Sequence, residues 1–504
     1  MRGPSSSHCA ASLRIGRLCR DLMAGDIQVL HIEFDPNGSL AATHKSQGAD
    51  MGLFGGILGW EADDERLPDY EAHIRRAGVT VTLDIVDIGA THPNTYKLTL
   101  ENDRERRSLI ALSVGGGMIE IIELEGAEVS IKGDCYETLV FTDAPDAAMA
   151  LLQQTAAFDE VKWRQGESCF VEVRSQQLLP DQVIAQLRGL PAVAAVRQLA
   201  PVLPILTRRD LEAPFITCAE MLAYNENRGL ALWELAVEYE SVRGDIPPAE
   251  VYDRMAAIVA IMRASLEQGL QGTEYADRIL GCQSLQYKAQ MENGRLLSGD
   301  VLNTIILYVT AMMEVKSAMG VIVAAPTAGA CAALPGAVLG AATALNLPEE
   351  EAVRAMLAAG MIGVFIAAHA TFAAEVGGCQ AETGSGAGMA AAAIVSLAHG
   401  TLAQALSAAS VALQNSFGLV CDPIANRVEA PCLGKNVMAA TNALSCANMA
   451  LADYDHLIPL DEVIGAMYEV GKSIPVELRC TGLGGLSTTK TAKRIEENLR
   501  SITP

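Results

Sequence analysis

Two long stretches of the sequence contain no Asp, Glu, Lys or Arg, and they limit the possible folds more than any other feature. They run from Ser317 to Leu347 and from Thr383 to Val420, and both are rich in Ala and Gly with few Leu, Ile or Phe. Each exceeds the ~20 residues that a membrane-spanning helix requires. Small residues also allow buried helices to approach one another closely inside a soluble core.

The surroundings of these stretches favour the soluble core. Pro326 and Pro335 interrupt the first stretch, and the charges that flank both are mostly acidic. A membrane span is normally oriented by a basic cluster at one end, and no such cluster is present here. We therefore expect buried helices rather than membrane insertion.

Composition narrows the class of protein. The chain has 504 residues, enough for two to four domains. Its formal charge of −23 argues against binding to nucleic acid or to an anionic membrane surface. Twelve cysteines in so long a chain do not form a disulfide framework, and residues 1–8 lack the apolar segment of a signal peptide. We therefore expect a cytoplasmic location, where thiols stay reduced.

Residues 1–132 are expected to form an α+β domain. β-Rich runs occur at 28–34, 79–85, 111–114 and 118–122, and Gly115-Gly-Gly117 is expected to form a turn between the last two. The turn is a simpler explanation of these glycines than a phosphate-binding loop.

Residues 133–205 follow the order strand, helix, strand, strand, helix, strand of a ferredoxin-like fold. The expected strands are 137–141, 161–163, 169–173 and 193–197, with helices at 146–156 and 180–187. This order resembles an ACT domain, a module that often senses amino acids. ACT domains usually begin with Asp-x-Pro-Gly, whereas residues 143–146 are Asp-Ala-Pro-Asp. The departure leaves effector binding open.

The remainder is expected to be a linker at 206–214 followed by an all-α domain at 215–504. Apolar residues recur at helical spacing in 218–229, 231–242, 248–270, 302–319 and 459–470. The predicted fold class is thus α+β multidomain, with a C-terminal all-α catalytic domain.

Three cysteines lie beside Gly or Pro in the small-residue region. They are Cys379 in Gly-Gly-Cys, Cys421 in Val-Cys-Asp-Pro and Cys432 in Ala-Pro-Cys. Three thiolates brought together by turns suit a metal or an iron–sulfur cluster, and a cube held by three ligands leaves one iron open to act as a Lewis acid. The alternative is three ordinary buried cysteines.

Two polar loops are further candidates for a site. Ser5, Ser6, Ser7 and His8 precede an expected helix at 10–22, and a helix N-terminus with hydroxyl groups favours a carboxylate. Simple N-capping is the alternative, although it needs only one Ser. His92 and Asn94 flank Pro93, so a turn would present both side chains, either to a ligand or to solvent.

Together these motifs resemble the iron–sulfur-dependent L-serine dehydratases (L-serine ammonia-lyases). The resemblance covers nearly the whole chain: residues 1–205 resemble the family's β portion, an allosteric-substrate-binding-like domain followed by an ACT domain, and 211–504 resemble its α portion. The most specific stretches are 3–8, 92–94, 325–329, 377–382, 388–394, 418–423 and 431–432.

The resemblance implies a [4Fe–4S] cluster on Cys379, Cys421 and Cys432, no pyridoxal phosphate, and elimination of water from L-serine to give pyruvate and ammonia. It implies that the Ser5–His8 loop holds the substrate carboxylate. His8, His92 and Asn94 would then be catalytic, and Thr327 and Arg479 would bind substrate. ACT modules commonly pair edge to edge, so a homodimer is expected.

Two residues near the C-terminus keep alternative interpretations. Cys480, where relatives have Glu, is either a fourth cluster ligand in a resting state or an ordinary thiol. Arg479 either pairs with an acidic group at the site or lies on the surface.

Several positions depart from the family pattern. Gln47 stands where His is usual, Lys316 and His369 where Asn is usual, and Cys9 and Thr371 where Thr and Ser are usual. A Lys is also lost within 281–286, although Lys288 is close. Lys316 or His369 could supply the lost charge.

These changes keep two alternatives open. One is a related lyase acting on threonine, cysteine or another small 2-amino or 2-hydroxy acid. The other is a non-catalytic sensor that binds amino acids.

Overall fold

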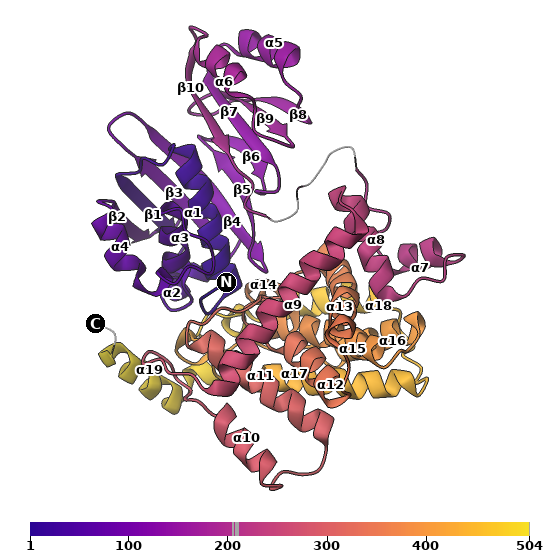
Figure 1. Ribbon diagram of the computed structural model, residues 1–504. Helices are drawn as coiled ribbons and strands as arrows, with labels where there is room; N and C mark the ends of the chain where they lie inside the picture. Colours follow the sequence, from indigo (N-terminus) through magenta and orange to yellow (C-terminus); the bar gives the residue numbers. More distant parts are fainter. Residues whose placement is uncertain (204–205, 207–210, 503–504) are drawn as a thin grey trace. The chain divides into compact units, whose positions relative to one another are not determined.

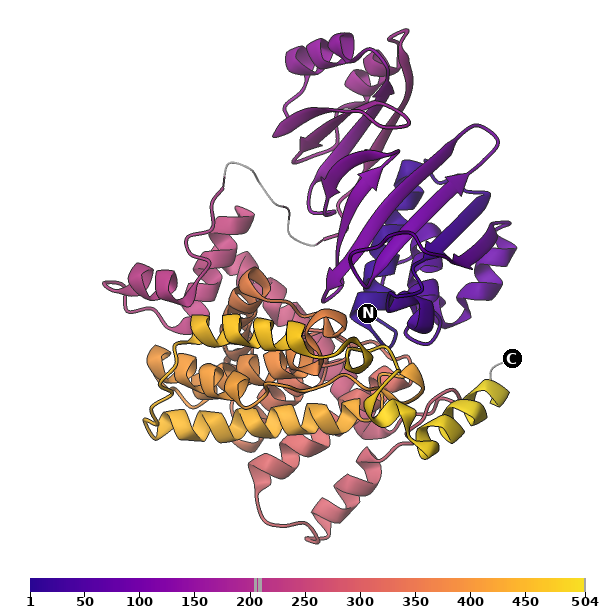
Figure 2. The same ribbon diagram turned by 180° about the vertical axis from the view of Figure 1, so that it is seen from behind.

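The computed structural model describes residues 1–203, 206 and 211–502. The chain forms two compact units, one from Met1–Ser6 with Ala213–Pro504 and one from Ser7–Glu212. We call them the helical unit and the β unit; Figures 1 and 2 show the β unit in indigo to magenta and most of the helical unit in magenta to yellow. Within the predicted linker 206–214, residues 207–210 lie outside the described residues, and the four-part division at 132, 205 and 214 stays a prediction.

The first sheet of the β unit has six strands in the order β2-β1-β3-β4-β5-β6. Its strands are β1 (Val29–Phe34), β2 (Thr80–Ile85), β3 (Thr95–Glu101), β4 (Arg106–Gly115), β5 (Met118–Leu124) and β6 (Ala127–Ile131). Only β1 and β2 pair in parallel. Every second residue of β1 is buried, as expected for a sheet with one covered face. The strands predicted between 28 and 122 and the turn at Gly115–Gly117 are confirmed.

Helices α1 (Ala11–Leu22), α2 (Leu40–Thr43), α3 (Ala49–Ile57) and α4 (Tyr70–Arg76) complete this part of the unit. Glycines let α1 and α3 pack with their backbones in contact. A Cβ atom at Gly52 would lie 2.0 Å from the carbonyl oxygen of Cys9, and one at Gly56 would lie 2.1 Å from that of Leu13. Larger residues are therefore excluded at this crossing.

The second sheet confirms the predicted order of elements between 136 and 199. Its four strands are antiparallel in the order β10-β7-β9-β8. They are β7 (Tyr136–Thr142), β8 (Glu160–Arg164), β9 (Phe170–Ser175) and β10 (Val193–Leu199), with α5 (Pro145–Thr155) and α6 (Asp181–Arg188) between them. This is the ferredoxin-like arrangement; its identification as an ACT domain stays a prediction.

The helical unit is built around α15 (Ser385–Leu397), in which every residue except Ser396 is buried. Against it pack α12 (Ala333–Ala344), α13 (Glu349–His369), α16 (Leu402–Gln414) and α17 (Cys432–Leu451). The charge-poor stretches thus form the predicted core of closely packed helices.

The other helices of this unit surround that core (Figure 1). They are α7 (Cys218–Asn225), α8 (Leu232–Gly244), α9 (Pro248–Gln271), α10 (Ser284–Glu292), α11 (Asp300–Ser317), α14 (Ala374–Gly377), α18 (Leu460–Ser473) and α19 (Lys490–Ile502). Among the described residues from 211 onward no strand occurs beyond one isolated bridge, so the all-α prediction is confirmed there.

One helix in the described part of the chain, α13, is long and apolar enough to cross a membrane by length and composition. Two thirds of its apolar window, 67%, is buried within the structure. The core helix of a soluble protein has the same properties, so this helix is weak evidence for a span.

Candidate active site

Three cysteines meet in one small buried cluster of the helical unit. Cys379, Cys421 and Cys480 are 4–6% exposed and form this cluster with Ala374, against which the partly buried Leu419 packs. The structure thus brings together two of the three predicted ligands and the candidate fourth.

Backbone hydrogen bonds hold the loops of this cluster in place. The amide of Cys421 donates to Leu478 O at 2.7 Å, and the amide of Cys480 donates to Cys421 O at 2.8 Å. On the other side, the amide of Gln380 donates to Leu419 O at 3.2 Å. This close approach needs Gly378, because a Cβ atom there would lie 2.8 Å from the same oxygen. Three separate chain segments are therefore fixed around the thiols.

Cys432, the third predicted ligand, begins α17 and packs with the main helical core. It is connected to the loop at 325–333 by Asn436, one turn further along the helix. The Asn436 amide nitrogen donates to Cys432 O at 2.9 Å and to Gly329 O at 2.8 Å. Its oxygen accepts from the amides of Ala332 and Ala333 at 3.3 and 3.0 Å. The side chain thereby makes all four hydrogen bonds available to it.

Burial keeps these thiols protonated in the protein itself. It raises the pKa of Cys379 to about 11 and raises the pKa of Cys432 further. A hydrogen bond with Cys480, followed by burial, raises the pKa of Cys421 well above its usual range. Thiolates would form here only with a bound cation, since coordination stabilises the deprotonated sulfur.

The three predicted ligands are not all in one packing cluster, since Cys379 and Cys421 lie together and Cys432 packs with the main helical core. Within the described residues, no group of three or more His, Cys, Asp or Glu side chains could hold a single metal ion. In an iron–sulfur cube each cysteine binds a different iron, so its ligands need not converge. Cysteine thiolates are the usual ligands of iron–sulfur clusters, so the donor chemistry of these residues suits such a cluster.

Glu382 brings a carboxyl group to this region. It lies three residues after Cys379, in the π-helical turn Gln380–Gly384, and its side chain hydrogen-bonds that of Thr327. Burial, and then the charge of Glu375, raises the pKa of Glu382 to about 7. The group can exchange a proton near neutral pH.

Thr327 is buried and accepts a hydrogen bond from the amide of Ala330 at 3.1 Å. The amide of the neighbouring Ala328 donates to the hydroxyl of Ser6 at 3.1 Å. Ser6 is held in the helical unit because the chain start pairs with that unit, Met1 N donating to Ile322 O at 2.7 Å. Ser6 and Thr327 therefore lie on adjacent segments.

The rest of the Ser5–His8 loop is buried as well. Within the β unit, His8 Nδ1 lies 3.2 Å from Ser7 Oγ, and His8 Nε2 lies 2.7 Å from Thr43 Oγ1. The capping alternative fails for α1, whose N-cap is Ala10 without a side-chain hydrogen bond. Residues Ser6–Ala10 instead form a π-helical turn.

His92 and Asn94 lie in the turn before β3 of the β unit. The amide of Asn94 donates to His92 Nδ1 at 3.1 Å, which fixes the imidazole. The Asn94 side chain is fully buried, and among the described residues neither its oxygen nor its nitrogen has a hydrogen-bond partner. A buried amide without partners is costly unless a ligand or water satisfies it.

Arg479 is partly buried and directly precedes Cys480 of the cysteine cluster. Its Nη1 donates to Val376 O at 3.1 Å, while its Nε is buried without a partner among the described groups. Cys480 follows with a φ of +64°, a left-handed conformation that is uncommon for a residue with a Cβ atom.

Several interacting polar groups in the two units were not predicted from the sequence. Lys435 pairs with Asp422 at 2.8 Å and donates to Val420 O at 2.6 Å, which braces the Cys421 loop. Asp422 directly follows Cys421, so its position was the available signal. In the β unit His44 Nδ1 lies 2.8 Å from Asp50, close in sequence to Gln47, where an imidazole was judged lost.

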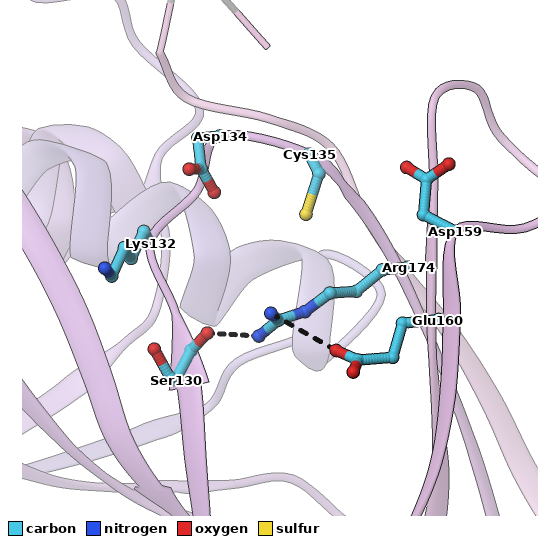
Figure 3. Close-up of a pocket in the computed structure, with 7 residues that line it drawn as sticks. All are labelled: Ser130, Lys132, Asp134, Cys135, Asp159, Glu160 and Arg174. Carbon is cyan, nitrogen blue, oxygen red and sulfur yellow. Dashed lines mark hydrogen bonds and ion pairs between the residues drawn. The ribbon is translucent and has the colours of Figure 1, made fainter. Parts of the chain in front are cut away.

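A separate cavity of about 280 Å³ lies in the β unit (Figure 3). It is lined by Ser130, Lys132, Asp134, Cys135, Asp159, Glu160 and Arg174. Arg174 donates to Ser130 O and pairs with Glu137 at 3.0 Å and Glu160 at 3.6 Å. Because its central cation is already paired, we do not assign this cavity to substrate.

Comparison with known proteins identifies similar chains. The family model "Serine dehydratase alpha chain" matches residues 227–487. A probable L-serine dehydratase alpha chain of Bacillus subtilis is 36% identical over 285 residues, which is 56% of this chain and 95% of that protein. The L-serine dehydratase alpha chain of Peptoniphilus asaccharolyticus is 37% identical over 284 residues, 56% of this chain and 97% of that protein. The L-serine dehydratase of Streptomyces coelicolor is 27% identical over 496 residues, 96% of each chain.

Proposed function

Since the chain belongs to the serine dehydratase alpha chain family, we propose that it is an L-serine dehydratase, a lyase that converts L-serine to pyruvate and ammonia. The L-serine dehydratase of Streptomyces coelicolor aligns with both units of this chain, so the β unit is included in the proposed enzyme. The alternative of a non-catalytic sensor loses its support, because the matched relatives are named as enzymes.

The observation that carries the proposal is a set of buried cysteine thiols on separate chain segments that backbone hydrogen bonds hold together. Cys379, Cys421 and Cys432 would hold a [4Fe–4S] cluster, as the donor chemistry fits one. When bound, such a cluster supplies an open iron that polarises the departing hydroxyl group of the substrate. No pyridoxal phosphate is required for this activation.

The chain's own residues would bind the substrate and move its protons. The hydroxyls of Ser5, Ser6 and Ser7, with His8, would bind the carboxylate. Thr327, whose side chain meets that of Glu382, would orient substrate beside a carboxyl group that titrates near neutral pH. The guanidinium of Arg479 would stabilise negatively charged groups at the cluster.

His92 and Asn94, which lie in the β unit, stay predicted catalytic residues. The unsatisfied amide of Asn94 is suited to hydrogen-bond a ligand, and His92 is held by the backbone next to it. Cys480 would protect the open iron while no substrate is bound. The ACT module, the homodimer and the cytoplasmic location stay predictions that accompany this function.

The test is anaerobic purification followed by a substrate panel of L-serine, L-threonine, L-cysteine and glycerate. We expect about four irons per chain and pyruvate with ammonia from L-serine. Turnover confined to another acid would favour the related lyase, an alternative motivated by Gln47 and Lys316. Iron-free protein that binds amino acids without turning them over would contradict both.

A further inference from the structure

A lysine is buried in the helical unit beside the candidate active site. Lys316 lies near the end of α11 with 1% of its surface exposed. Its Nζ donates a hydrogen bond to Val428 O, four residues before Cys432. The resemblance described above led us to expect Asn at this position, where this chain has Lys.

The ammonium of Lys316 has donors to spare. It carries three N–H groups, and in the described part of the chain it donates only to Val428 O, with no carboxylate within 4.0 Å. Lys435, by comparison, is paired with Asp422 at 2.8 Å. An unpaired buried charge is strongly unfavourable, so Lys316 is expected to acquire an anion.

Two acidic side chains on neighbouring segments already accept hydrogen bonds from other groups. Glu429 accepts from the amides of Ile279 and Leu280 at 2.9 and 3.2 Å. Glu314 accepts from the amide and hydroxyl of Ser284 at 3.0 and 2.6 Å. Neither carboxylate lies within 4.0 Å of Lys316 Nζ, so the ammonium is able to bind an anionic ligand.

The positive charge of Lys316 acts on two side chains of the candidate site, Cys432 and Glu382. Burial raises the pKa of Cys432, and the charge of Lys316 opposes that rise. Burial likewise raises the pKa of Glu382, and Lys316 again opposes it. Lys316 thus lies within electrostatic reach of a predicted cluster ligand and of the carboxyl group that contacts Thr327.

We propose that Lys316 supplies the positive charge that binds the carboxylate of the amino-acid substrate, in addition to the hydrogen bonds of the Ser5–His8 loop, and that it selects against substrates that lack this charge. The inference rests on the proposed function. The other charged candidates do not fit, because His369 is exposed and its Nε2 lies 2.9 Å from Ile216 O, and Lys288 is exposed. Lys316 is a substrate-binding residue that sequence comparison alone would describe only as a departure.

The proposal is tested with the anaerobic holoenzyme and the variants Lys316→Met, Lys316→Arg and Lys316→Asn. Removing one partner of a buried charge pair should raise KM for L-serine about 10²-fold in Lys316→Met, with a smaller change in kcat. Lys316→Arg should recover part of the loss. Lys472→Met, which removes an exposed lysine paired with Glu469, is the control.

L-Serinamide, which lacks the carboxylate, separates binding from folding. Wild-type enzyme should prefer L-serine over L-serinamide in kcat/KM, and Lys316→Met should lose most of this preference while keeping its iron content. A preference unchanged by the substitution would overturn the proposal. Loss of iron with an unchanged preference would also overturn it, since Lys316 would then balance the thiolate charges.

A binding measurement keeps this test independent of the proposed function. L-Alanine retains the carboxylate and ammonium but has no leaving group, and its affinity for the holoprotein can be measured by calorimetry. We expect about 10²-fold weaker binding to Lys316→Met than to wild type. Equal affinities, or no binding to the wild type, contradict the role of Lys316. Absence of pyruvate from L-serine contradicts only the proposed dehydratase.

Discussion

The two units each contain a buried polar cluster, and the clusters differ in how their charges are balanced. In the β unit, Arg174 pairs with Glu137, Glu160 and Glu172, at 3.0, 3.6 and 3.3 Å. In the helical unit the thiols are protonated by burial and Lys316 has no carboxylate partner among the described residues. The cation of the first cluster has its carboxylate partners in place, whereas the cation of the second has none among the described residues.

The difference shows how a structure can separate stabilising groups from binding groups. A buried ion pair with its partners in place contributes to a specific fold, and removing one partner leaves an uncompensated charge. A buried polar group without a partner lowers stability until something binds to it. Substitutions in the two clusters should therefore have different consequences.

The largest effect is expected from the predicted cluster ligands. Changing Cys379, Cys421 or Cys432 to Ser should abolish iron binding, because a three-ligand cluster has no spare thiolate. The value of kcat/KM should fall more than 10³-fold, which is the order of effect seen when an enzyme loses a main catalytic group. Iron quantification and pyruvate release measure both losses. Cys446→Ala, another buried cysteine of α17, should keep both. Retained iron in a Ser variant would remove that residue from the ligand set.

The next largest effect is expected in the balanced cluster. Arg174→Ala should lower the free energy of unfolding by about 3 kcal/mol, because Glu137 would remain buried without its cationic partner, whereas Glu172 would keep Arg164. Iron content in surviving protein should not change. Urea unfolding followed by the fluorescence of Trp163, on β8 of the same sheet, measures the loss in a background where Trp60 and Trp233 are Phe. An unchanged unfolding midpoint would show that these charges are not part of the fold's stability.

A smaller effect concerns pH. Burial, and then the charge of Glu172, raises the pKa of Glu137 to about 8. The folded state therefore holds its proton more tightly than the unfolded chain, so stability is greatest below the ordinary Glu pKa and falls as pH rises towards 8. Stability should therefore fall progressively between pH 5 and 8, and Glu137→Gln should remove this pH dependence. The exposed Glu61→Gln is the control, and equal slopes for all three proteins would contradict the assignment.

The smallest effect is expected from Cys480. If its thiol shields the open iron between turnovers, Cys480→Ala should keep most activity in anaerobic assays but lose it several-fold faster in air. The time course of inactivation after exposure to oxygen measures this, with Cys446→Ala as the matched variant. Complete loss of iron in Cys480→Ala would instead make Cys480 a permanent ligand.

Sequence patterns gave most of the fold because the elements are locally regular. The alternation in β1 and the helical spacing of α9 depend on neighbours in the sequence, and both elements lie within one or two residues of prediction. The start of α1 was harder, since capping by Ser was a reasonable alternative that the π-helical turn at Ser6–Ala10 replaces.

The site was only partly predictable, because its remaining groups are joined by contacts distant in sequence. The cysteines were recognised beside Gly and Pro, but the 2.8 Å bond between Cys480 N and Cys421 O connects residues 59 positions apart. The unsatisfied amide of Asn94 and the isolation of Lys316 are likewise properties of burial. No local pattern reports whether a polar group finds a partner.

The side chain of Asn436 has a mechanical consequence. Its amide nitrogen donates to the carbonyl oxygens of Cys432 and Gly329, and its oxygen accepts from the amides of Ala332 and Ala333. One planar group therefore connects a predicted cluster ligand with the loop that carries Thr327. A displacement of that loop by a fraction of an ångström would strain these hydrogen bonds and shift Cys432. The Asn436 side chain thus links the position of Cys432 to that of the loop that carries Thr327.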